Sequence, residues 1–334
     1  SHGLHPRCDP WWVPLGSPRT NEPGRRSFTP PFPAYPSGHA TFGAAAFESV
    51  RLFFGVGTSS NYNLFFYLVS DEFEGRALAA ERRMFPGEIE PFIDLSTGIN
   101  PRPYPLPALP EDLFKRLPDR AAVERLATVA ADAYGAPGAE CVVPAPGTQI
   151  LLPQAAMLVP PGCAAILRTT YAEHRRATSL AEHSVTEVST ADQLRRADLA
   201  LVVNPSNPDG LIVERATLLG VAKDLRPRGG VLVVDESFAD VAPPGASLAG
   251  DVGRGNIVVL RSFGKFYGLA GLRLSFAIAP PEIATRIATG IGPWPVGGAA
   301  LEIGAAALAD MAWREKSRGA LAAAQARLRR LPPK

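Results

Sequence analysis

The sequence predicts an α/β protein in which a seven-stranded, mostly parallel sheet lies between helices. The first observation is a series of short runs rich in Val, Ile, Leu and Ala, which indicate buried strands. They lie at residues 141–143, 164–167, 185–188, 199–203, 231–234, 257–260 and 272–279. The second observation is that helix-forming stretches separate these runs, as expected where helical crossovers join parallel strands.

Helices and irregular segments account for the rest of the chain. Residues 111–134 carry apolar side chains at helical spacing and residues 299–328 are rich in alanine, so each stretch is predicted to form a helix. Residues 94–107 are rich in proline and predict an irregular arm. Near the N-terminus a further helix is predicted over residues 39–54, where Ser37 can cap its start and Gly55 can end it.

The composition excludes several classes of protein. The chain has 334 residues, of which 46% are hydrophobic and 20% charged, enough to bury a sizeable core. A net charge of +2 without a dense basic block argues against nucleic acid as a partner. No stretch approaches the roughly 18 apolar residues of a membrane span. Three cysteines without CxxC spacing favour a reducing, cytoplasmic compartment, with neither a disulfide framework nor a metal site.

Residues 261–273 (RSFGKFYGLAGLR) carry the strongest chemical signal. Lys265 lies just beyond the strand at 257–260, with Ser262 three residues before it and Arg273 eight residues after it. Lysine is the residue that forms Schiff bases with pyridoxal 5′-phosphate (PLP). A serine hydroxyl and a guanidinium are good phosphate partners. The alternative for this stretch alone is a solvated loop lysine that happens to lie beside a serine and an arginine.

Three further segments follow predicted strands, where an open sheet of this class binds its ligand. Gly147 and Thr148 open a helix and could bind an anion. Asn207 lies in the loop NPSNPDG. Asp235 ends a very apolar strand, so its carboxylate needs a cationic partner such as a protonated pyridine nitrogen. Each segment alone could be only a turn, a loop or a cap, but their joint occurrence on successive strands favours a PLP site.

From about residue 78 onwards the chain resembles the fold-type-I, aspartate-aminotransferase-like PLP enzymes. Within them it most resembles the threonine-phosphate decarboxylases of cobalamin biosynthesis, which are close relatives of histidinol-phosphate aminotransferases. The motifs that carry the resemblance are FIDLSTGINPRPYP, APGTQ, TYAEH, NPSNPDG, VVDESFADV, RSFGKFYGLAGLRLSFA and GPWPV. It implies an N-terminal arm at 78–110, a PLP-binding large domain at 111–298, and at 299–334 a helix leading into a truncated C-terminal domain.

The resemblance also implies roles for individual residues. Lys265 would hold PLP covalently, Asp235 would pair with the pyridine nitrogen, and Asn207 would hydrogen-bond the ring hydroxyl. The phosphate would be bound by four residues, which are Gly147, Thr148, Ser262 and Arg273. His174 would stack on the cofactor ring, although a surface imidazole in a helical turn is the alternative.

In the arm, the resemblance implies that Gly98 and Asn100 approach the substrate. Phe238 stands where many aminotransferases have a tyrosine, and Asp209 replaces the threonine of NPxNPTG. Both departures are in keeping with the decarboxylase subgroup. The family's small C-terminal domain, with the arginine that clamps the substrate carboxylate, is expected to be missing. A large domain without it is expected to expose apolar surface.

The implied function is decarboxylation of L-threonine O-3-phosphate to (R)-1-aminopropan-2-yl phosphate, with truncation expected to impair it. A PLP-dependent aminotransferase of the histidinol-phosphate type is an alternative. The substrate would be a small phosphorylated amino acid, and the resemblance implies a homodimer.

Residues 1–77 resemble a different family, the vanadium-dependent haloperoxidases. The motif PSGHATF carries this resemblance and VSDEFEG continues it. By position, Ser37, Gly38 and His39 would form an oxyanion site at a helix N-terminus. The remaining basic residues of that site have no match in the chain. We therefore expect an incomplete, poorly ordered or loosely docked fragment joined to an incomplete PLP enzyme. A remnant haloperoxidase or acid phosphatase activity and an inactive chimera are further alternatives.

Overall fold

A computed structural model describes residues 97–168, 170–207 and 209–330. In this part of the chain one seven-stranded sheet has the order β1-β7-β6-β5-β4-β2-β3. β7 runs antiparallel to both of its neighbours, β1 and β6, and every other pair of strands is parallel. The strands are β1 Val142–Ala145, β2 Cys163–Leu167, β3 Ser184–Val188, β4 Leu199–Val203, β5 Val231–Asp235, β6 Ile257–Ser262 and β7 Ser275–Ile278. The predicted α/β class and the seven-stranded, mostly parallel sheet are confirmed.

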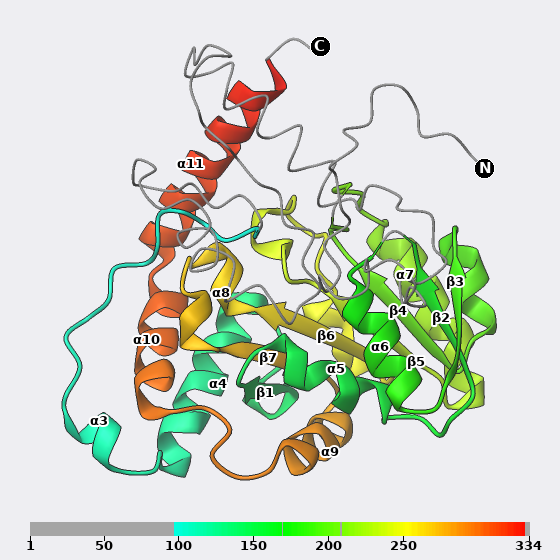
Figure 1. Cartoon of the computed structure of the whole chain (residues 1–334), viewed down its shortest axis with the longest axis horizontal. Coiled ribbons are helices and arrows are strands. Elements are labelled where there is room, and N and C mark those ends of the chain that lie inside the picture. The colour runs from blue at the N-terminus through cyan, green and yellow to red at the C-terminus, as the bar shows by residue number, and fades with distance from the viewer. Residues whose placement is uncertain (1–96, 169, 208, 331–334) are drawn as a thin grey trace, which may run out of the picture. The chain divides into compact units, whose positions relative to one another are not determined.

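Helices cover both faces of this sheet (Figure 1). Side chains of α4 (Arg120–Tyr134), α7 (Arg215–Leu225) and α10 (Gly298–Ala309) belong to the apolar core on one face. Side chains of α5 (Thr148–Ala156), α6 (Ala172–Leu180) and α9 (Pro281–Ile291) belong to the core on the other face. Alternate residues along the strands face the two cores, so the central strands are buried on both sides.

The other elements are short, apart from α11. They are α3 (Asp112–Lys115), α8 (Phe263–Phe266), α11 (Met311–Arg329) and the 3-10 turns Ala139–Cys141, Ala191–Arg196, Arg226–Arg228, Ala239–Val241, Ala249–Arg254 and Ala270–Leu272. The last of these turns corrects the prediction of a strand over 272–279. Arg273, which follows it, has a φ of 53° in the left-handed region, so the extended backbone of β7 begins only at Ser275.

Two predicted helices are each broken in two. The stretch 111–134 forms α3 and α4, because Leu117 precedes Pro118 and a residue before proline disfavours the helical region. Asp119 then caps α4 by accepting a hydrogen bond from the backbone N of Ala122 at 2.7 Å. The stretch 299–328 breaks at Asp310, whose carboxylate caps α11 by accepting from the backbone N of Trp313 at 2.9 Å.

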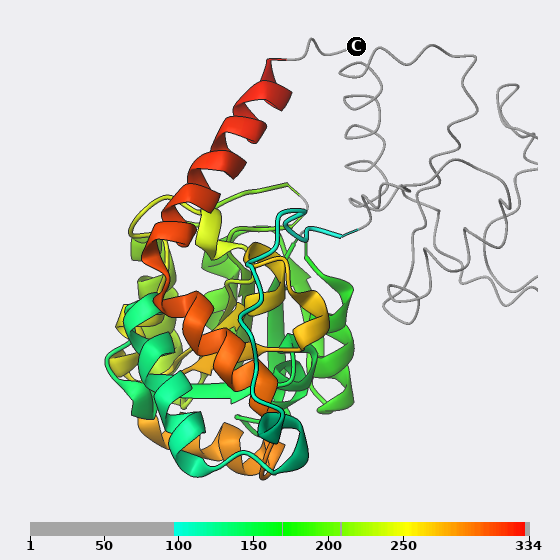
Figure 2. The ribbon, with the colours of Figure 1, turned by 90° about the vertical axis from the view of Figure 1, so that its left-hand side faces the viewer.

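The arm at residues 97–110 runs past α10 towards α3 (Figure 2). The backbone N of Tyr104 donates to the carbonyl of Tyr267 at 2.8 Å, and the Tyr104 ring lies edge-on to Trp313 of α11. These contacts tie the middle of the arm to the C-cap residue of α8 and to α11.

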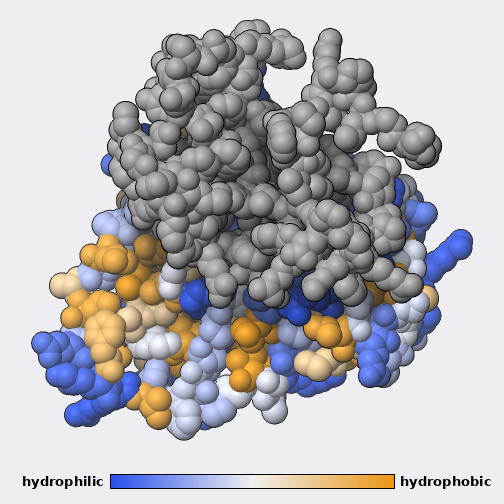
Figure 3. Space-filling model, viewed as in Figure 1, coloured by the Kyte–Doolittle hydropathy of each residue, from blue (hydrophilic) through white to orange (hydrophobic). Residues whose placement is uncertain are grey.

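Several large apolar side chains are exposed on the described part. Hydrophobic residues gather on the side where α3 and α10 lie (Figure 3). Phe114 on α3, Leu117 after it and Met311 on α11 are each about two thirds exposed. None of the helices in the described ranges combines the length and the apolar character needed to cross a membrane.

Candidate active site

Lys265 lies on α8, the single helical turn that follows β6 directly. Its backbone carbonyl accepts a hydrogen bond from the N of Asn100 in the arm at 2.9 Å. Its Nζ lies 5.7 Å from the centre of the Phe238 ring. Lys265 therefore stands where the arm, the segment after β5 and the end of β6 converge.

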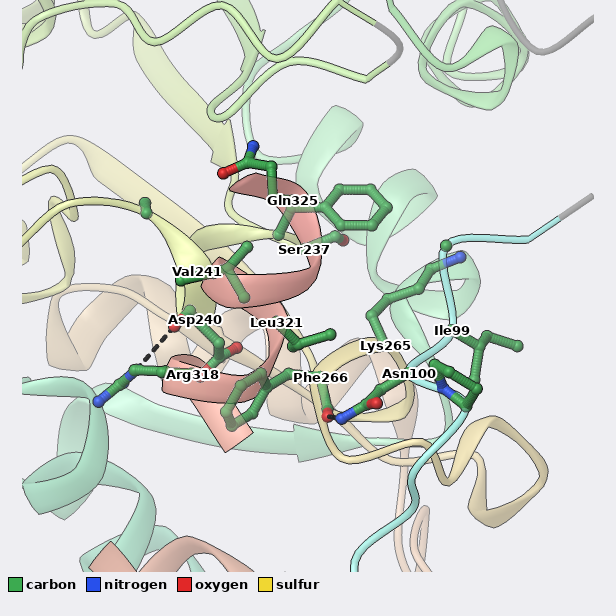
Figure 4. Close-up of a pocket in the computed structure, with 15 residues that line it drawn as sticks. Ile99, Asn100, Ser237, Asp240, Val241, Lys265, Phe266, Arg318, Leu321 and Gln325 are labelled. Carbon is green, nitrogen blue, oxygen red and sulfur yellow. Dashed lines mark hydrogen bonds between the residues drawn. The ribbon is translucent and has the colours of Figure 1, made fainter. Parts of the chain in front are cut away.

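A cavity of about 410 Å³ opens beside Lys265. Lys265 and Asn100 approach it from α8 and the arm, whereas Leu321 and Gln325 come from α11 (Figure 4). Arg318 also lines this cavity, but its Nε donates to the backbone carbonyl of Asp240 at 2.7 Å. Apart from these polar groups the lining is mainly apolar, as in most small-molecule sites.

The predicted phosphate-binding residues meet at one edge of the sheet. In the strand register Ser275 of β7 pairs with both Ala145 of β1 and Ser262 of β6. Gly147, two residues after Ala145, has a φ of 100° and is the N-cap residue of α5, whose first residue is Thr148. A Cβ added at Gly147 would lie only 3.0 Å from Cζ of Arg273, so this guanidinium sits against the helix N-terminus. The cluster joins a cation to the N-terminus of α5, a combination that suits a phosphate, although the backbone N of Gly147 itself donates to the carbonyl of Ala145 at 2.9 Å.

Asp235 lies at the end of β5 with 5% of its surface exposed. Its Oδ2 lies 3.0 Å from Nε2 of His174. Its Oδ1 accepts hydrogen bonds from the backbone N of Ser237 at 2.9 Å and from the Ser237 hydroxyl at 2.6 Å. Burial works to raise the pKa of Asp235, but the hydrogen bond and charge of His174 and the bonds from Ser237 outweigh it and lower the pKa. The carboxylate is therefore held ionised, as a partner for a protonated pyridine nitrogen must be.

His174 is buried, with 1% of its surface exposed, so the alternative of a surface imidazole is wrong. The bond to Asp235 was not predicted, because no spacing in the sequence brings α6 beside β5. That neighbourhood arises only from the sheet order, in which β2, β4 and β5 lie side by side. Stacking of His174 on a cofactor ring stays a prediction.

The remaining predicted residues lie as follows. Asn207 is half-buried in the loop after β4. A Cβ added at Gly98 would lie 2.7 Å from the Phe238 ring, so the arm passes close over that ring. The side chain of Asn100 donates to the carbonyl of Phe266 at 2.9 Å and to the Ser317 hydroxyl at 3.1 Å. These bonds make Asn100 an anchor of the arm, and its substrate contact stays a prediction. Ser37, Gly38, His39 and the predicted helix at 39–54 lie outside the described residues.

A buried ion network beneath the site was also missed. Arg261 is the residue before Ser262. Its Nη1 lies 3.0 Å from Oε2 of Glu236, and its Nη2 lies 3.0 Å from Oδ1 of Asp240. Burial works to lower the pKa of Arg261, but the carboxylates of Asp240 and Glu236 outweigh it and raise the pKa. The charged guanidinium thus ties the segment after β5 to the end of β6.

These residues together fit PLP. An anion-binding edge, an ionised buried carboxylate and a lysine beside a cavity correspond to the phosphate, the pyridine nitrogen and the aldehyde carbon of that cofactor. A side chain at position 147 would collide with the Arg273 guanidinium, so the glycine there lets this cation lie against the start of α5.

Comparison with known proteins identifies the family of the chain. The family model for aminotransferase class I and II matches residues 112–331. The threonine-phosphate decarboxylase of Sinorhizobium sp is 43% identical over 232 residues, which are 69% of this chain and 69% of that protein. The enzyme of the same name from Pseudomonas aeruginosa is 40% identical over 263 residues, 78% of this chain and 77% of that protein. The histidinol-phosphate aminotransferase of Moorella thermoacetica is 39% identical over only 127 residues, 37% of this chain and 33% of that one.

Solved structures show the same fold. A putative histidinol-phosphate aminotransferase from Erwinia carotovora atroseptica has a TM-score of 0.56 at 20% identity, covering 61% of this chain and 64% of its own. The L-threonine-O-3-phosphate decarboxylase of Porphyromonas gingivalis has a TM-score of 0.53 at 23% identity, covering 59% and 61%. The chain thus spans somewhat less than two thirds of these solved structures.

A separate family model, the VCPO second helical-bundle domain, matches residues 4–84, all of which lie outside the described residues. The rest of the chain is consistent with a single assignment. With its family match, its relatives, its sheet and its lysine site in agreement, the chain belongs to the aminotransferase class I and II family of PLP-dependent enzymes.

Proposed function

We propose that the chain decarboxylates L-threonine O-3-phosphate to (R)-1-aminopropan-2-yl phosphate in cobalamin biosynthesis. The observation that carries this proposal is the 40–43% identity to two threonine-phosphate decarboxylases over more than two thirds of the chain. Matches to histidinol-phosphate aminotransferases cover far less of it.

The chain's own residues would hold PLP at three points. Gly147, Thr148, Ser262 and Arg273 would bind the phosphate. Asp235 would accept a hydrogen bond from the pyridine nitrogen, Asn207 would bond the ring hydroxyl, and Lys265 would bind covalently. Bound in this way, PLP supplies an electron sink for the carbanion that is left when CO2 departs.

Asp235 and Lys265 would control the positions of two protons, one on the pyridine nitrogen and one returned to Cα. The carboxylate of Asp235, kept ionised by His174 and Ser237, would hold a proton on the pyridine nitrogen. The amine of Lys265, displaced by the amino group of the substrate, would be free to return a proton to Cα. Because its Nζ lies beside the cavity and near the Phe238 ring, this transfer would occur against an apolar wall.

The test begins with purified protein and added PLP. Borohydride should fix the cofactor to wild type but not to Lys265→Ala, as measured by the mass of the labelled peptide. Wild type should then release CO2 from threonine phosphate. Folded wild-type protein that takes up no PLP would contradict the assignment of the site.

An aminotransferase of the histidinol-phosphate type is the second candidate, and the Moorella match favours it. It predicts transfer of the amino group to a keto acid and no CO2. Measuring both products in one reaction separates the two functions. We also propose a homodimer, which sedimentation of the PLP-loaded protein would test.

A further inference from the structure

A side-chain hydrogen bond joins the first turns of α5 and α6. The Nε2 of Gln149 donates to Oε2 of Glu173. Gln149 is the residue after Thr148, and Glu173 is the residue before His174. The contact therefore connects α5, whose start carries predicted phosphate-binding residues, with α6, which carries His174, the partner of Asp235.

The side chain of Glu173 is only 8% exposed, which is unusual because glutamate side chains mostly lie on the surface. Its carboxylate is neutralised from the solvent side by Arg176, whose Nε lies 2.7 Å from both carboxylate oxygens and whose side chain is 58% exposed. An ion pair of this kind forms as readily on the surface, where it avoids the cost of desolvation. Burial instead lets the carboxylate reach Gln149 on the neighbouring helix.

His174 is fixed independently on its other sides. Its Nε2 faces Asp235, and its backbone carbonyl accepts a hydrogen bond from the Thr178 hydroxyl at 2.6 Å. Gly147 and Thr148 are likewise fixed by β1, which they follow. Besides the apolar packing of α5 against α6, the pair Gln149 and Glu173 links these two groups by a hydrogen bond.

We propose that Glu173 is a positioning residue that sets the spacing between the phosphate-binding start of α5 and the His174–Asp235 pair. This inference rests on the proposed use of PLP. A ligand that spans both groups gains full affinity only if their separation matches its own length. The affinity of a ligand that contacts only one of the two groups does not depend on that separation.

The comparison of PLP with pyridoxal, which lacks the phosphate, tests this role. Each aldehyde is titrated by absorbance into wild type, Glu173→Ala, Gln149→Ala and the double variant. We expect each single change to raise the Kd of PLP about tenfold, the worth of one charge-assisted hydrogen bond. The Kd of pyridoxal should change less than about twofold, and the double variant should be no worse than either single one.

Two further variants sharpen the test. Glu173→Gln keeps an oxygen that can accept from Gln149, so it should bind PLP within about threefold of wild type. Glu187→Ala is the matched control, because it breaks the exposed pair with Arg175 on the same helix without touching α5, and should change neither affinity.

Equal losses for PLP and pyridoxal would overturn the inference, since they would indicate a general structural role for Glu173. Additive losses in the double variant, or no loss in either single one, would also overturn it. Wild type that binds no PLP would instead refute the proposed function, which is a distinct result. If Glu173→Ala fails to fold, Gln149→Ala carries the same test.

Discussion

At the scale of single residues, the charge of Asp235 depends on its two neighbours. Its pKa in the folded protein lies below the ordinary value of 3.8, so its ionisation stabilises the fold above the unfolded-state pKa. That contribution is lost as the pH falls through the folded-state pKa.

Replacement of His174 by phenylalanine should weaken this dependence. Burial is then opposed only by the two hydrogen bonds from Ser237, so the pKa of Asp235 rises and its ionisation contributes less stability at neutral pH. At pH 7 we expect a loss of about 1.5–3 kcal/mol in the free energy of unfolding, measured by urea denaturation from pH 3 to 7. His174→Gln, which can still donate to Asp235, should retain most of the stability. Parallel pH profiles for wild type and His174→Phe would contradict the argument.

Gly98→Ala tests the close approach of the arm to Phe238. The new Cβ would lie 2.7 Å from the ring, so the ring beside Lys265 must move. We expect kcat/KM to fall by about tenfold to a hundredfold with little change in the Kd of PLP. Gly271→Ala is the control, because a Cβ there meets nothing within 4 Å. Recovery in the double variant Gly98→Ala, Phe238→Leu would support the steric cause, and equal effects of the two glycine changes would exclude it.

At the scale of elements, the start of α5 depends on a glycine for two separate reasons. Gly147 has a φ of 100°, and the space for its Cβ is taken by the guanidinium of Arg273. Gly147→Ala should therefore weaken PLP binding more than tenfold, because backbone strain of about 1–3 kcal/mol adds to the collision. The measurement is a PLP titration alongside the thermal midpoint. Gly245→Ala, with a φ of 82° and open space, should be destabilised yet keep its affinity for PLP.

The elements also show what could be predicted from the sequence and what could not. Strands were found because buried parallel strands are apolar on both faces, which is a local property. The breaks at Pro118 and Asp310 carry local signals, proline and an acidic cap, that the longer apolar patterns at 111–134 and 299–328 obscured. The residues on strand ends could be proposed because parallel strands end at one edge. The contact of His174 with Asp235 and the ion network of Arg261 join segments that are distant in the chain. No local sequence pattern predicts such contacts.

At the scale of the whole molecule, the Arg261 network holds the segment after β5 against the end of β6, its neighbour in the sheet. Arg261→Met would leave the buried carboxylates of Glu236 and Asp240 without their cation. We expect a loss of about 3–5 kcal/mol in the free energy of unfolding, measured by urea denaturation. Arg175→Met removes an exposed ion pair and should cost less than about 1 kcal/mol. Similar losses in the two variants would mean that burial of the network contributes little.

The sheet order has a consequence for how the protein is made. Among the described strands β1 pairs only with β7, although Val142 and its partner Ile278 lie far apart in the chain. During synthesis, β1 to β6 and the start of α5 leave the ribosome before β7 does. At that stage β1 has not yet met its partner strand in the described sheet. Arg273 and β7 then emerge together. The predicted phosphate-binding residues therefore come together late, in the same step in which β7 pairs with β1. PLP present at the ribosome would therefore meet the complete set of predicted phosphate-binding residues only after β7 has docked. Until then β1 leaves a strand edge open to pairing with other chains.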